Sequence, residues 1–86
     1  MMVIETTFKP IWPVPVQIRI GAGRSKQVKG PEDALYYITN RWPSTKGNRL
    51  ELARLSCMRM LKRQERCDDA RNAFVSAALE ANVLVL

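Results

Sequence analysis

The side chains that could do chemistry in this chain are few, and structural roles explain most of them. The chain has no histidine, which removes the most common general base and a very common metal ligand. Two pairs of adjacent acids, Glu32-Asp33 and Asp68-Asp69, could in principle bind a metal or act as an acid and a base. Both pairs stand where a helix is expected to begin, and negative charge there stabilises the helix dipole. The acids therefore indicate helix starts, with Asp68 or its neighbour as a cap, rather than a metal site.

The remaining candidates carry equally weak signals. The four serines of residues 25–76 have no base near them in sequence, and Gly21-Ala22-Gly23 lacks the third glycine and the following helix of a phosphate-binding loop. Cys67 stands near an expected helix N-terminus, a position that can lower the pKa of a thiol. No second thiol or base that would make it reactive is close in sequence. We therefore expect no enzymatic activity, no catalytic, metal-binding or cofactor-binding residues, and no small-molecule substrate.

The cysteines and the apolar segments set the expected environment. Cys57 and Cys67 are the only two thiols among 86 residues, without CxxC spacing, so we expect them to be reduced and structural. No run of about 18 apolar residues is present, and residues 1–5 do not resemble a signal peptide. These features predict a cytoplasmic protein that does not span a membrane.

The positive charge is concentrated in the middle of the chain. The formal net charge is +6, and residues 41–66 account for this excess. The cations of that segment are Arg41, Lys46, Arg49, Arg54, Arg59, Lys62, Arg63 and Arg66, against Glu51 and Glu65. Any electrostatic binding should therefore involve this segment.

The elements that must position these residues follow from hydrophobic periodicity. Residues 1–11 have little pattern and are expected to be weakly ordered, whereas 12–86 are expected to form a single α+β domain. Strict alternation over residues 12–20 predicts a strand with Trp12, Val14, Val16, Ile18 and Ile20 on its inward face. Residues 21–25 predict a turn and 26–28 a return strand. The apolar residues 83–86 predict a C-terminal strand that joins this hairpin in a small antiparallel or mixed sheet.

Three helices are predicted between the hairpin and the C-terminus. The first begins at Gly30-Pro31 and ends near Arg41, because Pro43 disfavours helical geometry at Trp42. We expect the Trp42 indole to fold over the core, so the stretch RWPSTKG, residues 41–47, is a joint between helices. The second helix spans about 48–63 and the third begins at 67–69. The expected buried positions of the second and third helices are Leu50, Ala53, Cys57, Met60 and Leu61, and Ala70, Ala73, Phe74, Ala77, Ala78 and Ala81.

The outward face of the second helix is the candidate interaction surface. At about 100° per residue, the side opposite Leu50 carries both cations and leucines, namely Arg49, Leu52, Leu55, Arg59, Lys62 and Arg63. Three interpretations remain open. The cations can complement the helix dipole while the leucines meet another part of the chain. The face can be a protein interface, in its simplest form that of a homodimer. It can also contact nucleic-acid phosphates weakly and without sequence preference.

The order of several short motifs resembles the domain of unknown function 982 family, a group of short alphaproteobacterial proteins. The motifs are Pro15-Val16, Val28-Lys29-Gly30-Pro31 with Ala34, Arg41-Trp42-Pro43 with Gly47, Ala53 with Cys57 and Leu61, and Ala70-Arg71-Asn72-Ala73-Phe74 with Ala77, Ala78 and Ala81. The resemblance covers residues 14–85, with Leu50 where the family often has an aromatic residue. It implies a bacterial protein and carries over no activity. We expect a non-enzymatic protein-interaction module, with weak nucleic-acid binding as the alternative.

Overall fold

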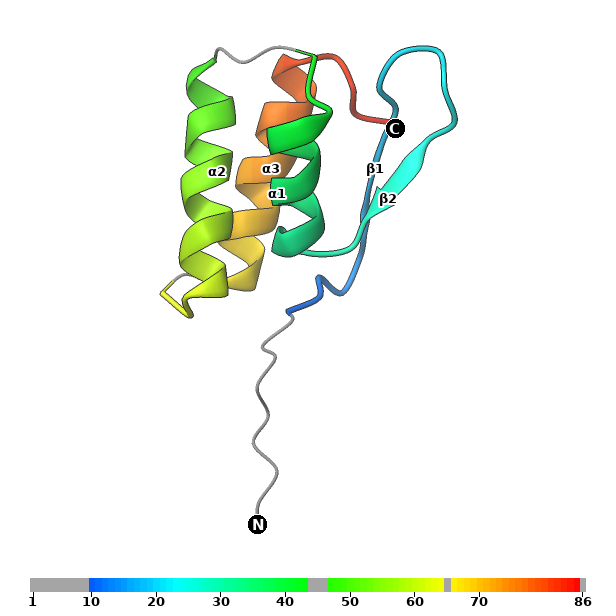
Figure 1. The fold of residues 1–86 in the computed structure, drawn as a ribbon. Coiled ribbons are helices and arrows are strands. Elements are labelled where there is room, and N and C mark those ends of the chain that lie inside the picture. Colours follow the sequence, from blue (N-terminus) through cyan, green and yellow to red (C-terminus); the bar gives the residue numbers. More distant parts are fainter. Residues whose placement is uncertain (1–9, 44–46, 65, 86) are drawn as a thin grey trace.

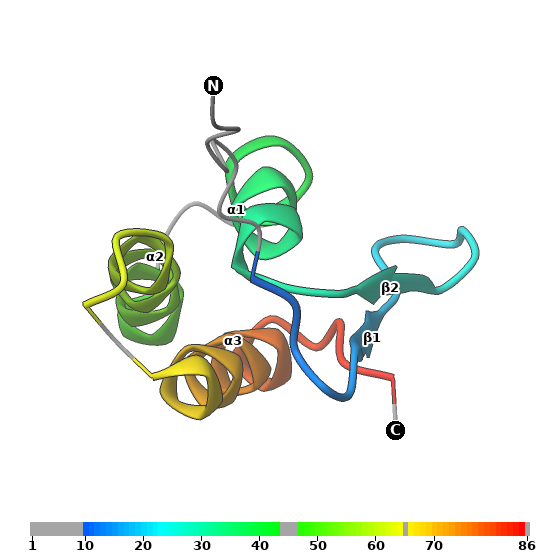
Figure 2. The ribbon, with the colours of Figure 1, turned by 90° about the horizontal axis from the view of Figure 1, so that it is seen from below.

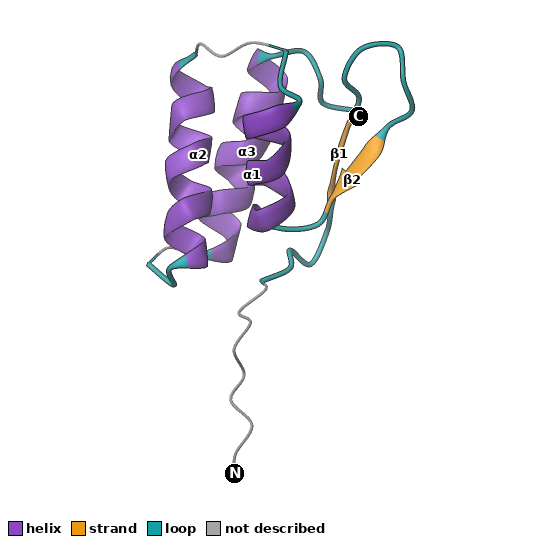
Figure 3. Ribbon diagram, viewed as in Figure 1, coloured by secondary structure: helices purple, strands orange, loops and turns teal. Residues whose placement is uncertain are grey.

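Five elements make up the fold seen in a computed structural model, which describes residues 10–43, 47–64 and 66–85. Several predicted features lie partly outside the described residues, namely residues 1–9 of the weakly ordered segment, 44–46 of the RWPSTKG joint, Glu65 of the basic segment and Leu86 of the C-terminal strand. A short hairpin precedes three helices, which confirms the predicted α+β class (Figures 1 and 3). The elements are β1 (Val16–Ile18), β2 (Lys26–Val28), α1 (Pro31–Asn40), α2 (Asn48–Leu61) and α3 (Cys67–Glu80).

The hairpin is antiparallel, with Val16 opposite Val28 and Ile18 opposite Lys26. Gly21 adopts a φ of 71° in the turn after β1, a conformation that glycine takes at little cost. Both strands are three residues long, so β1 is much shorter than the strand predicted over residues 12–20.

Val14 corrects the predicted strand face. It was expected to point inward, but its side chain is 61% exposed. The chain bends at Pro13 and Val14, and the Nε of Arg71 in α3 donates a hydrogen bond of 2.8 Å to the carbonyl oxygen of Val14. Because the backbone is bent here, the alternation that places Trp12, Val16 and Ile18 inside does not pass through Val14.

α1 begins as the sequence predicts. Gly30 is extended and Pro31 occupies the first turn, where a missing N–H costs nothing. Glu32 and Asp33 lie in the same turn, and Asp33 accepts a hydrogen bond of 3.3 Å from the backbone N–H of Lys29. These acids therefore have the helix-start role expected of them.

α3 begins without the side-chain cap that was expected from Asp68 or its neighbour. Its N-cap residue is Arg66, and no side chain there hydrogen-bonds to the helix. Asp68 and Asp69 lie inside the first turn instead, where their charge still favours the helix dipole.

α2 and α3 end in the same backbone motif. After α2, Arg63 takes a left-handed φ of 61°, its N–H donates to Met60, and the N–H of Gln64 donates to Arg59. After α3, Asn82 takes a left-handed φ of 60°, its N–H donates to Leu79, and the N–H of Val83 donates to Ala78. This pair of hydrogen bonds is a Schellman motif, which satisfies the last carbonyl groups of a helix. α2 therefore ends at Leu61, two residues before the predicted end.

The chain returns to the hairpin after α3, as predicted, but without a full strand. The N–H of Arg19 donates to Val83 at 2.8 Å, and the N–H of Val85 donates to Gln17 at 2.9 Å. Ile18 and Leu84 form an isolated antiparallel bridge. Few described residues remain for pairing, because the N–H of Val83 still bonds to Ala78 at the end of α3.

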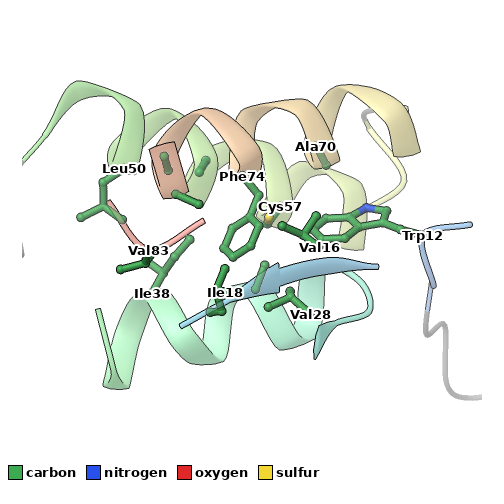
Figure 4. Packing of buried hydrophobic residues seen from close by; sticks show 14 of the residues in the cluster. Trp12, Val16, Ile18, Val28, Ile38, Leu50, Cys57, Ala70, Phe74 and Val83 are labelled. Carbon is green, nitrogen blue, oxygen red and sulfur yellow. The ribbon is translucent and has the colours of Figure 1, made fainter. Parts of the chain in front are cut away.

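The core lies between the hairpin and the three helices, and Phe74 is at its centre. Figure 4 shows the Phe74 ring pointing from α3 towards β1. Its centroid lies 5.8 Å from that of Trp12 and 5.5 Å from that of Trp42. Trp42 is half-buried against this cluster, which confirms that it covers the core at the joint after α1. Other large core side chains are Val16, Ile18, Val28, Ile38, Leu50, Met60 and Val83, and the thiol of Cys57 is also buried.

Candidate functional site

α2 is the outermost helix of the domain. It packs against α1 and α3 and makes no contact with either strand. Figure 2 shows it on the side of the molecule opposite the hairpin. One side of α2 is therefore covered by its two neighbouring helices, and the other side is uncovered by any described part of the chain.

The covered side of α2 agrees with the predicted stripe. Leu50, Ala53, Cys57 and Met60 are buried, and Leu61 is half-buried. The small side chains of α3, chiefly Ala70, Ala77 and Ala78, are also buried and allow the two helices to approach closely.

The uncovered side of α2 exposes three large apolar side chains. The exposed fraction is 57% for Leu52, 45% for Leu55 and 40% for Met58. Leu52 and Leu55 were predicted to face outward, and their exposure confirms this. Met58 was not predicted, although it stands three residues after Leu55 and therefore on a neighbouring position of the same side.

The predicted cations surround these apolar residues. Arg49, Arg59, Lys62 and Arg63 are all exposed. Lys62 caps the end of α2, and Arg63 follows it in the left-handed conformation, so Arg63 does not follow the helical spacing that had placed it. Glu51 supplies a negative charge on the same helix and forms a 3.0 Å ion pair with Arg54.

α3 adds one apolar residue beside the start of α2. Leu79 is 55% exposed, and with Arg49, Ser76 and Glu80 it lines a shallow hollow. Sequence reasoning missed Leu79, although it stands opposite the Ala70 and Phe74 stripe on a helical wheel. We use the term outer face for the residues Arg49, Leu52, Leu55, Met58, Arg59, Lys62, Arg63 and Leu79.

Glu80 belongs to the same end of the domain. A Cβ atom at Gly47 would lie 2.6 Å from the Oε1 of Glu80, so this carboxylate lies directly beside the N-terminus of α2. Gly47 has a φ of 140°, which favours glycine. Two carboxylates, Glu51 and Glu80, therefore lie near the N-terminus of α2, where the outer face has Arg49, and Arg59 and Lys62 lie near the other end.

The two cysteines differ in their burial. Cys57 is buried, Cys67 is half-buried, and the two are not joined by a disulfide. Burial, and secondly the Asp68 carboxylate, raise the pKa of the Cys67 thiol. A helix N-terminus can lower the pKa of a thiol, but here desolvation and a neighbouring negative charge both disfavour the thiolate.

The described residues bring together few other reactive groups. Within residues 10–43, 47–64 and 66–85, no charged or polar residue is buried and no three His, Cys, Asp or Glu side chains form a group that could hold a metal ion. In the same part of the chain, no helix combines the length and the apolar character that crossing a membrane requires.

The fold and this surface define a small α+β domain with one exposed basic and apolar helix face. The chain belongs to the family described as "Protein of unknown function (DUF982)", whose model matches residues 14–85. The match confirms the family resemblance over the predicted range. No curated protein and no solved structure matches this chain.

Proposed function

We propose that this domain is a non-enzymatic module that binds protein through its outer face. The observation that carries the proposal is the exposure of Leu52, Leu55 and Met58 in one row, on a side of α2 that no described part of the chain covers. Apolar side chains that gather on one surface and are bordered by polar ones mark binding sites more often than chance exposure.

The composition of the outer face supports this proposal. Protein interfaces typically have an apolar centre, a polar rim, and more arginine and methionine than the remaining surface. Here Leu55 and Met58 form part of the centre, and Arg49 and Arg59 are exposed at its border. Stabilisation of the helix dipole explains the cation Arg59 in the last turn of α2, but it gives no reason for the exposed leucines.

The proposal places the domain in the cytoplasm. Neither Cys57 nor Cys67 forms a disulfide, and thiols stay reduced in that compartment.

Nucleic-acid binding is the second candidate, favoured by the positive charge of α2. Arg49, Arg59 and Lys62 are exposed and could each contact a phosphate. α3, which follows α2, carries Asp68, Asp69 and Glu80 against Arg71, a charge unsuited to a helix that enters a DNA groove. A mobility-shift assay over a series of salt concentrations tests this candidate. Binding that weakens steeply with salt supports it, and no binding at low salt contradicts it.

In-cell photo-crosslinking tests the protein-binding proposal. A benzophenone amino acid is placed at Leu52 on the outer face, and in a second variant at Gln27, an exposed position on β2. We expect a covalent protein adduct from position 52 and none from position 27, because Gln27 lies on the hairpin, away from α2 (Figure 2). Equal adducts from both positions, or none from position 52, would contradict the proposal.

A further inference from the structure

We infer that the partner of the outer face is a second copy of this chain, with the two α2 helices packed antiparallel across a two-fold axis at Leu55. This inference rests on the proposed function, because it names the protein that the outer face binds. Three features of the described residues carry it: the spacing of the apolar side chains, the distribution of charge along α2, and the absence of a strand or third helix over α2.

The apolar spacing is symmetric about Leu55. Leu52 stands three residues before it and Met58 three residues after it, and all three are exposed. In an antiparallel pair centred on Leu55, a residue that stands a given number of positions before Leu55 in one copy faces the residue that stands the same number of positions after Leu55 in the other copy. Leu52 then packs on the partner's Met58, and Leu55 packs on the partner's Leu55. One symmetric contact thus covers the whole apolar row.

The charges also match in this orientation. Glu51 stands four residues before Leu55 and Arg59 four residues after it, so the antiparallel arrangement brings Glu51 near the partner's Arg59. Lys62 is brought near the partner's Asn48, at the end of α2 where Glu80 lies beside Gly47. At each end of the contact, Glu51 and Glu80 of one copy are therefore brought towards Arg59 and Lys62 of the other. Arg49 lies at the N-terminal end of α2 too and lines a hollow together with Glu80 of its own chain.

A parallel arrangement lacks this complementarity. It would place Lys62 beside the partner's Lys62 and Arg59 beside the partner's Arg59, which costs free energy through like-charge repulsion. It would also align the two helix dipoles, whereas an antiparallel pair places the positive end of one helix beside the negative end of the other.

The size of the contact sets the expected strength. Each copy contributes three apolar side chains from α2, with Leu79 of α3 at the border. Interfaces that bury less than about 1,200 Å² in total are weak or transient. We therefore expect a dimer that forms and dissociates readily, and that is seen by sedimentation equilibrium as a rise in average mass with concentration.

Cysteine cross-linking tests the axis. The tests use a Cys67→Ser background that keeps the buried Cys57, with this background alone as the control. A disulfide requires Cα atoms within about 7 Å. In the proposed dimer, the Cα atoms of residue 55 in the two copies lie next to the axis and meet this limit. The Cα atoms of residue 52 in the two copies are separated by about 9 Å along the helix direction alone, which exceeds it. Under mild oxidation we expect Leu55→Cys to form dimers with itself. We expect Leu52→Cys to form them with Met58→Cys when the two are mixed, and not with itself.

Charge reversal tests the orientation. In the proposed dimer, Lys62 of each copy lies near Glu80 of the other. Lys62→Glu and Glu80→Lys should each weaken dimerisation about three- to tenfold, since either change removes both of these ion pairs. The double variant should restore most of the loss, because every chain then carries both reversed charges. Circular dichroism of each variant checks that α2 remains folded. Single variants that leave the dimer unchanged, or a double variant weaker than either single one, would overturn the orientation.

The outcomes separate this inference from the proposed function. A wild-type chain that stays monomeric up to millimolar concentration overturns the dimer. A photo-adduct at position 52 whose mass is twice that of the chain supports it, whereas an adduct with a different protein or with nucleic acid overturns it. An adduct with a different protein still supports protein binding through the outer face. Only the absence of any protein adduct contradicts both protein binding and the dimer.

Discussion

The ring of Phe74 packs against two indoles, with its centroid 5.8 Å from that of Trp12 and 5.5 Å from that of Trp42. Trp12 precedes β1, Trp42 follows α1, and Phe74 belongs to α3. Three distant parts of the chain therefore meet at one side chain. In a domain of 86 residues, which buries a smaller fraction of its surface than a large one, such a contact carries a large share of the stability.

Truncation of Phe74 should therefore be severe. We expect Phe74→Ala to lower the free energy of unfolding by about 3–5 kcal/mol, through lost burial and the cavity left behind. Urea denaturation followed by tryptophan fluorescence measures the loss. Asn72→Ala, at an exposed position of the same helix, is the control and should change stability by no more than about 0.5 kcal/mol. Similar effects of the two substitutions would contradict the central position of Phe74.

The two valines on either side of the bend before β1 should differ in the same assay. Val16 is 2% exposed and Val14 is mostly exposed. We expect Val16→Ala to cost about 2 kcal/mol, from the apolar surface and volume removed, and Val14→Ala to cost no more than about 0.5 kcal/mol. If the strand were straight and Val14 were buried, the two substitutions would lower the free energy of unfolding by similar amounts.

Helical periodicity in the sequence was sufficient to locate the three helices and their buried sides. The starts of α1, α2 and α3 and the buried positions Leu50, Ala53 and Phe74 follow from local spacing, from Pro31 and from Pro43. The outward position of Leu52 and Leu55 follows from the same spacing. These features depend on residues three or four apart, which the sequence displays directly.

The features that could not be predicted depend on contacts between distant residues or on backbone choices that side-chain type does not dictate. Arg71, far along the chain, bonds to the carbonyl of Val14, and no local pattern signals that contact. Arg63 takes the left-handed position at which glycine is usual, so the end of α2 was placed too late. The pKa of Cys67 rises because tertiary packing desolvates its thiol.

The left-handed conformation of Arg63 should be measurable as a cost. A residue with a Cβ atom in this conformation loses roughly 1 kcal/mol or more relative to glycine. We expect Arg63→Gly to be more stable than Arg63→Ala by about 1 kcal/mol. Both variants lose the arginine side chain and its interactions, so the difference between them reports the backbone alone. Equal stability of the two variants would show that the φ of 61° is not maintained in solution.

The raised pKa of Cys67 predicts slow reaction at neutral pH. Burial and Asp68 hold the thiol in its neutral form, so the thiolate fraction is lower in the folded chain than in the unfolded chain. Alkylation by iodoacetamide, followed by mass spectrometry, should be slower in buffer than in urea. Its rate should rise only at more alkaline pH, and Asp68→Asn should shift the rise towards lower pH. The raised pKa also makes folding stability depend on pH. The stabilisation from the neutral thiol is fully present below the pKa that Cys67 has in the unfolded chain, and it is lost as the pH rises through the pKa in the folded chain. Faster alkylation in the folded chain would contradict this.

Gly30 should tolerate no side chain, because residues 10–12 run directly against it. It is buried, a Cβ atom there would collide with the carbonyl of Pro10, and the N–H of Trp12 bonds to Lys29 at 2.7 Å next to it. The φ of Gly30 is −176°, which any residue can adopt, so the constraint is one of space and not of backbone strain. We expect Gly30→Ala to cost about 1–3 kcal/mol, as overpacking typically does. Gly23→Ala is the matched control, since its nearest neighbour would be the carbonyl oxygen of Ile20 at 3.9 Å, and it should be nearly neutral. If Gly30→Ala is as stable as Gly23→Ala, the segment before β1 does not pack against Gly30 in solution, and the burial of Trp12 must have another cause.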